Sequence, residues 1–292
     1  MIRINERRCK ERFYEGEHLK IWDLQRYRIP NNYIYNSVPA YPEGVEFHIS
    51  RLRHDTNLRG YHGICNSSGF KKPTESDSPE RDLVWWSPDI SRRDITAAEE
   101  QYLDKEEIEY PEKQFLHKFT SSPAFLSSSR LGNFRFSMPI HDLFESYKEQ
   151  FCADLRPHIR IFETVVYKQE VMYSIVIHSP SARDLFSKYP LLKDTPNAVC
   201  VFRHGNIIWR PQAMSKRHSF RLSCNMQAIR IATAYREDYV WDNIGVAFHV
   251  PHGKTLSFTK KTLTKSLRLC KGAEPKSHNE EFVTCEFDLI RP

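Results

Sequence analysis

The chain has 292 residues, and 43 Lys and Arg residues against 37 Asp and Glu residues give it a formal net charge of +6. Hydrophobic residues make up 40% of the sequence and charged residues 27%, which is the balance of a folded globular protein and excludes collagen-like, coiled-coil and low-complexity proteins. At roughly 150 residues per domain, the length predicts one large domain or two small ones.

The first fifty residues predict an irregular extension. Pro30, Pro39 and Pro42 interrupt tyrosine-rich stretches there and allow at most short edge strands. Residues 45–52 then alternate apolar and polar side chains at period two, which predicts a half-buried strand leading to His54.

Two helices are predicted in the middle of the chain, each after a strand. Residues 83–87 predict a strand, and Asp89 or Ser91 can cap the helix that follows it through Leu103. A strand at residues 133–138 precedes a second, amphipathic helix. The apolar face of that helix consists of Ile140, Leu143, Phe144, Tyr147 and Phe151.

Predicted strands dominate the rest of the chain. They are residues 159–167, 171–178, 198–202, 206–210, 228–234 and 239–250. His204-Gly205 is a hairpin signal, and three prolines within residues 179–196 predict a linker. We therefore expect an α/β or α+β protein with an extension (residues 1–50), a mixed core (51–180) and a β-rich region (181–292) that ends in a basic helix.

The positive charge is concentrated near the C-terminus. Residues 254–271 hold six basic residues and no acidic one, so they carry the whole excess. Leu263, Leu267 and Cys270 recur at helical spacing, which predicts an amphipathic helix with a basic outer face. Such a face is usually only solvated, but it also suits phosphate. The residues available for an RNA contact are Lys260, Lys261, Lys265 and Arg268.

The cysteines and the termini bear on location. Seven cysteines are an odd number, are widely spaced and include no C-x-x-C pair, which predicts reduced thiols. Residues 1–17 have no apolar core and do not resemble a secretory signal. No stretch reaches the roughly 20 apolar residues that a membrane helix needs. We expect a cytoplasmic or nuclear protein without membrane contact.

Three motifs occur in a recognisable order. The run LRHDT at residues 52–56 is followed by Gly69-Phe70, the run VWWS at residues 84–87 leads into a helix, and the run EVMY at residues 170–173 opens a strand. This order resembles the ADP-ribosyltransferase fold of the poly-ADP-ribose polymerase type. The resemblance covers about residues 50–180.

The resemblance implies an ADP-ribosyltransferase-like core that binds NAD. Glu170 would bind a ribose hydroxyl and stabilise the oxocarbenium character of the transition state. His54 would anchor the ribose, and Thr56 would support the turn. Trp85 would stack on nicotinamide, with Ser87 near its amide.

Two positions depart from the family pattern. Asp55 stands where the family usually has a glycine that lets backbone approach the ligand, and Trp85 or Trp86 stands where it usually has tyrosine. An inactive relative with a degenerate pocket is therefore the other interpretation. Each residue also has a structural explanation: His54 ends a strand, one tryptophan of the pair faces the core, and Glu170 is an exposed charge in a turn.

Metal chemistry finds less support in the sequence. His54, His62 and Cys65 have metal-like spacing but no evident fourth ligand, whereas structural zinc takes four. The pair His249 and His252 has the same deficit. Motifs typical of Rossmann enzymes, P-loop NTPases and zinc proteases are missing. We predict no metal site.

Four short phrases resemble a multigene family of fish interferon-induced, virus-responsive proteins. They are LHKF at residues 116–119, GNFRF at 132–136, YKQEVMY at 167–173 and YVWD at 239–242. The resemblance implies a cytosolic antiviral effector or regulator. Two functions are therefore expected: an ADP-ribosyltransferase-like protein of innate antiviral defence that binds NAD, or a non-catalytic interferon-induced regulator that acts through protein partners.

Overall fold

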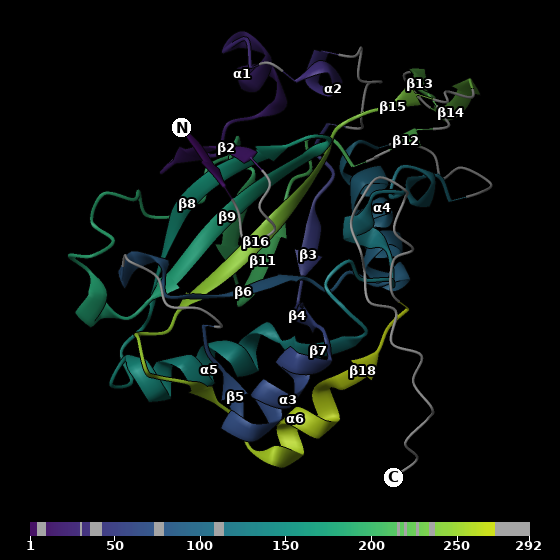
Figure 1. Ribbon diagram of the computed structural model, residues 1–292. Helices are drawn as coiled ribbons and strands as arrows, with labels where there is room; N and C mark the ends of the chain where they lie inside the picture. Colours follow the sequence, from purple (N-terminus) through teal and green to yellow (C-terminus); the bar gives the residue numbers. More distant parts are fainter. Residues whose placement is uncertain are drawn as a thin grey trace.

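The computed structural model describes residues 1–4, 10–29, 31–35, 43–72, 79–107, 114–214, 217–218, 221–225, 228–233 and 237–271, with backbone alone between 217 and 238. Within these residues the protein is a mixed α/β structure with one large, mostly antiparallel sheet (Figure 1). This architecture fits the α+β class. Over the same residues, no helix has the length and apolar character that crossing a membrane requires.

Nine strands form the large sheet, in the order β1-β2-β8-β9-β16-β6-β4-β7-β18. Their bounds are β1 Ile2–Ile4, β2 Lys10–Glu15, β4 Arg51–Thr56, β6 Leu83–Pro88, β7 Phe134–Pro139, β8 His158–Tyr167, β9 Glu170–His178, β16 Trp241–His249 and β18 Leu267–Leu269. Of the neighbouring pairs in this sheet, only β9 and β16 run parallel. Because β16 pairs with both β9 and β6, this sheet continues across the boundary expected at residue 180.

The remaining elements pack around this sheet. A three-stranded sheet has the order β10-β11-β3, with β10 Cys200–Arg203, β11 Asn206–Trp209 and β3 Phe47–Ile49. Short strand pairs are β5 Gly69–Phe70 with β17 Leu256–Ser257, β12 Arg217–His218 with β15 Glu237–Asp238, and β13 Arg221–Asn225 with β14 Ala228–Thr233. The helices are α1 Ile21–Arg26, α2 Asn32–Tyr35, α3 Leu58–Ser67, α4 Arg92–Lys105, α5 Ile140–Phe151 and α6 Lys260–Ser266. Short 3-10 turns are η1 Pro79–Arg81, η2 Leu116–Lys118, η3 Pro123–Phe125 and η4 Pro180–Ala182. In Figure 1, α3, α5 and α6 gather at one end of the molecule and α1 and α2 at the other.

The two faces of the large sheet differ in burial. Side chains alternate between the faces along each strand. The core face carries fully buried residues such as Trp86, Val171, Tyr173, Ile244 and Val246. The opposite face, here called the outer face, is only partly covered. It carries Trp85, Glu163, Glu170, Met172 and Asn243.

Most expected elements are confirmed, and the confirmed ones have strong local signals. Ser91 caps α4, and its hydroxyl accepts a hydrogen bond from the backbone N–H of Asp94. The second predicted helix is α5, and the hairpin at His204-Gly205 joins β10 to β11. The predicted strand at residues 45–52 is divided, because β3 and β4 belong to different sheets.

Two sequence-based expectations are wrong, and one helix, α3, was not predicted. The N-terminal extension holds α1, which anchors itself by burying Ile21 and Leu24. The glycine-containing segment after β4 is α3, where the side chain of Asn57 accepts from the N–H of Gly60 and caps the helix despite the low helix propensity of glycine. The basic helix α6 ends at Ser266. The chain then forms β18 because pairing with β7 outweighs the helical spacing of the apolar residues.

Candidate functional site

His54 lies on the core face of the sheet and is half-buried. Its ring packs against Phe70 and Trp86, with ring centroids 5.1 Å and 5.5 Å away. Its Nδ1 is 2.8 Å from the carbonyl oxygen of Trp85, to which the neutral imidazole donates from that nitrogen. Burial lowers the pKa of His54, so the uncharged ring is favoured. The residue joins β4 to β6 as a core histidine.

Trp85 and Ser87 project from the outer face of β6, opposite to His54. The Trp85 ring lies against Gly245, where an added Cβ would come within 3.2 Å of both the ring and the sulfur of Met172. Thr56 ends β4, with its hydroxyl against Gly60 at the start of α3, so it supports the strand end. The structure therefore brings Trp85 next to His54 in the backbone but separates their rings by the thickness of the sheet.

Glu170 begins β9 and is held by an arginine. Its two carboxylate oxygens accept hydrogen bonds from one Nη of Arg130, at 3.0 Å and 3.2 Å, and the guanidinium of Arg130 lies over the ring of Trp241. Strand register places Trp85 level with Val176, six residues further along β9 than Glu170. Six residues of strand span about 20 Å. His54, Trp85 and Glu170 therefore do not line one cleft, and the transferase hypothesis remains a prediction without support from this arrangement.

Asp55, which replaces the glycine of the family pattern, takes part in a structural ion pair. Its carboxylate accepts hydrogen bonds from Nε and Nη2 of Arg135, at 2.7 Å and 2.9 Å. On the same face, Arg53 donates to the carbonyl oxygen of Leu126 at 3.1 Å. The Asp55–Arg135 pair thus joins β4 to β7, and Arg53 fastens the loop of residues 121–132 to β4. This loop supplies Arg130, which holds Glu170.

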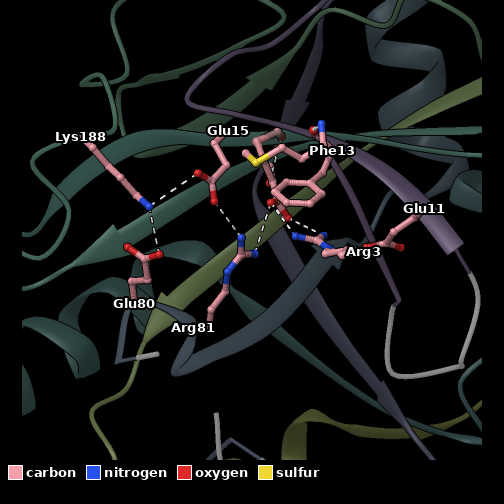
Figure 2. Close-up of polar contacts among 10 residues, drawn as sticks. Arg3, Glu11, Phe13, Glu15, Glu80, Arg81 and Lys188 are labelled. Atoms are coloured by element: carbon pink, nitrogen blue, oxygen red, sulfur yellow. Dashed lines mark hydrogen bonds and ion pairs between the residues drawn. The ribbon is translucent and has the colours of Figure 1, made fainter. Parts of the chain in front are cut away.

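The outer face also carries a network of ion pairs that the sequence did not reveal (Figure 2). Its centre is Glu163, which is fully buried and accepts hydrogen bonds from both Nη atoms of Arg3 at 2.7 Å. Arg81 lies 3.2 Å from Glu163 and 3.0 Å from Glu15. Lys188 extends the network to Glu15 and to a further glutamate, Glu80. No local sequence signal could have shown it, because Arg3 and Glu163 are 160 residues apart.

A basic hollow of about 260 Å³ lies beside β2 and β8, on the face of the sheet opposite to the ion-pair network. Its lining residues are Lys10, Arg12, Ile29, Asn31, Val166, Tyr167 and Lys168. Three of these are cations and none is a carboxylate. A sequence alone could not indicate this hollow, because its residues come from three separate stretches of the chain. Its three cations would suit an anion.

The remaining candidates are surface cations and possible metal ligands. Lys260, Lys261, Lys265 and Arg268 are exposed on α6 and β18. Across the described side chains, no three His, Cys, Asp or Glu residues are placed to hold a metal ion. The described cysteines that are free thiols are Cys65, Cys152, Cys200 and Cys270. Comparisons of the chain with protein-family models, with curated proteins and with solved structures found no match.

Proposed function

We propose that this protein is a non-catalytic binding protein, which acts through its partners and does not transfer ADP-ribose from NAD. The observation that carries the proposal is the position of Glu170. Its carboxylate is paired with Arg130, and it lies about 20 Å along the sheet from the tryptophan that was expected to stack on nicotinamide. A carboxylate so placed cannot face a developing positive charge beside Trp85.

The surroundings of His54 support the same conclusion. A ribose anchor must reach a ligand, whereas this imidazole is packed among Phe70 and Trp86 and donates to a main-chain oxygen. Protein partners in innate antiviral defence are part of the proposal, and this part rests on the resemblance of the four sequence phrases. NAD is not required by it.

The test is turnover of labelled NAD by the purified chain and by Glu170→Gln and Arg130→Gln variants. We expect none of the three proteins to release nicotinamide or to become labelled, and all three to keep the same circular dichroism spectrum. Labelling of the unmodified chain that disappears in Glu170→Gln would overturn the proposal and restore the transferase hypothesis. The Arg130→Gln variant shows whether an intact Glu170 becomes active once it is freed from its arginine.

A further inference from the structure

A row of three histidines crosses one end of the large sheet. His158 begins β8, His178 ends β9 and His249 ends β16. Alternation along β9 puts His178 on the outer face with Met172, and His158 is its partner in register, with the two rings stacked at 5.4 Å. Phe186 packs against both His178 and His249, with ring centroids 4.7 Å and 5.0 Å away. Burial lowers the pKa of each histidine, so the neutral rings are favoured.

Arg160 lies beside this row, two residues after His158 on β8, and is only 8% exposed. Its Nε donates to Nε2 of His178 at 2.9 Å, and its Nη1 donates to the carbonyl oxygen of Tyr189 at 2.6 Å. Because Nε2 of His178 accepts, the proton of this ring is on Nδ1, which donates to the carbonyl oxygen of Ser179 at 2.8 Å. Nη2 of Arg160 makes no hydrogen bond to any residue that the structure describes.

The charge of Arg160 has no carboxylate beside it within the described part of the chain. No ion pair there includes Arg160 or Arg183. Burial lowers the pKa of Arg160, and the positive charge of Arg183 lowers it further. Arg3 gives the contrast, because burial also lowers its pKa but Glu163 and Glu11 raise it above the ordinary value. A buried cation without a counter-charge is costly, and a bound anion would remove that cost.

Arg183 and His158 lie on the accessible side of Arg160. Arg183 directly follows η4, which itself begins two residues after the end of β9, and its side chain is exposed, whereas His158 is half-buried. Burial lowers the pKa of His158, and the charges of Arg160 and Arg183 lower it further. The guanidinium of Arg183 is therefore within electrostatic reach of both other groups. Neither side chain hydrogen-bonds to a described residue, so three groups with free donors gather at one place on the outer face.

We propose that Arg160, Arg183 and His158 bind the phosphate of a phosphorylated side chain on a partner protein. A phosphate monoester carries nearly two negative charges and three strong acceptor oxygens, which match two guanidinium groups and an imidazole. Nη2 of Arg160 donates to one oxygen from the buried side, and Arg183 and His158 bind the phosphate from the exposed side. Clusters of arginine are a recurrent means of recognising phosphorylated partners. The inference deepens the proposed function and rests on it, since it gives the chemistry of the protein partner.

The experiment measures fluorescence anisotropy of short, labelled alanine-based peptides with a central phosphoserine or phosphotyrosine. Matched peptides carry serine, tyrosine or glutamate at that position. We expect at least one phosphopeptide to bind about 10-fold or more tightly than its unphosphorylated match, the effect of one hydrogen bond between charged groups. The glutamate peptide should also bind more weakly, because it has one charge and two acceptor oxygens. Unlabelled phosphopeptide, inorganic phosphate and adenosine monophosphate are then compared as competitors.

Two variants test the site without disturbing a hydrogen bond of the described structure. Arg183→Gln and His158→Gln each remove one group of the site, and each should weaken binding of the phosphopeptide, Arg183→Gln by about 10-fold or more. Arg156→Gln is the matched control, because Arg156 is exposed and its charge does not act on His158 or Arg160. It should leave binding unchanged. Arg160→Gln also removes the bonds to His178 and Tyr189, so the two other variants keep the test decisive if Arg160→Gln does not fold.

Three results would overturn the inference. They are equal binding of phosphorylated and unphosphorylated peptides by the unmodified chain, equal losses in Arg183→Gln and Arg156→Gln, and displacement of the probe by adenosine monophosphate at a lower concentration than by unlabelled phosphopeptide. The last result would assign the site to a nucleotide and not to a protein. Because nicotinamide release is a separate readout, a chain that binds no phosphopeptide and turns over no NAD contradicts this inference alone.

Discussion

Replacing Arg3 by methionine removes the main partner of a buried carboxylate while keeping an unbranched side chain about as long as the aliphatic stem of arginine. Arg3 binds Glu163 through two hydrogen bonds of 2.7 Å, and the Glu163 side chain has no exposed surface. Removing one partner of a buried ion pair costs about 3–5 kcal/mol, because the remaining charge stays in a low-dielectric site. Arg81 still lies 3.2 Å from Glu163, so we expect the lower end, about 3 kcal/mol.

The measurement is thermal and urea unfolding of the purified variant. At about 2 °C or more for each kcal/mol in a chain of this size, the melting temperature should fall by about 6 °C or more. The chain contains a matched control, because Arg203 also binds one carboxylate, that of Asp194, through two hydrogen bonds of 2.7 Å, with side chains that are 39% and 42% exposed. Arg203→Met should leave the melting temperature nearly unchanged, because water solvates both charges.

A double variant separates the lost ion pair from lost packing. Glu163→Leu added to Arg3→Met removes the unpaired charge and should recover part of the stability. If Arg3→Met lowers the melting temperature no more than Arg203→Met does, the buried network does not stabilise the attachment of β1 and β2, and the reasoning from burial is refuted.

Two further predictions concern stability. Gly132→Ala should lower the free energy of unfolding by about 2 kcal/mol or more, because Gly132 has a φ of +136° and an added Cβ would overlap the backbone at the end of β4. Gly63→Ala, whose added Cβ would meet no atom within 4 Å, should be neutral or stabilise α3 by up to about 1 kcal/mol. Equal effects of the two substitutions in urea unfolding would contradict this reasoning. Burial lowers the pKa of His18 and of His178 to about 4, so their unfolded forms bind more protons between pH 4 and 6.5 and stability should fall on acidification through that range. Burial raises the pKa of Asp242 to about 7, so its folded form holds the extra proton and its effect on the pH dependence of stability has the opposite sign. Asp242→Asn should therefore steepen the loss of stability on acidification, measured by urea unfolding at a series of pH values. An unchanged slope of stability against pH would count against the raised pKa.

The sequence was sufficient where the signal was local. The apolar spacing of α5 and the cap at Ser91 are properties of neighbouring residues, and both elements form where they were expected. The helical spacing after Lys260 failed because a strand partner, β7, was available only in the folded protein. Local preference sets an element only where no stronger tertiary pairing competes with it.

The candidate sites depended on which face each side chain takes. Period-two alternation shows that Trp85 and Trp86 point to opposite faces, but a sequence does not say which face is the core. Packing of Trp86 against Phe70 decides this, and it turns Trp85 and His54 away from each other. His54 and Trp85 therefore lie on opposite faces of the sheet, an arrangement that only the tertiary structure decides.

Charge shows the same division between sequence and structure. The sequence alone determined the composition, the net charge and the concentration of basic residues at 254–271. In β2, however, Lys10, Glu11 and Arg12 add up to only one positive charge along the chain. The fold separates them, because the strand turns the two cations to the hollow and the glutamate to Arg3 on the outer face. A sum over sequence averages across both faces of a strand, whereas a ligand meets only one of them.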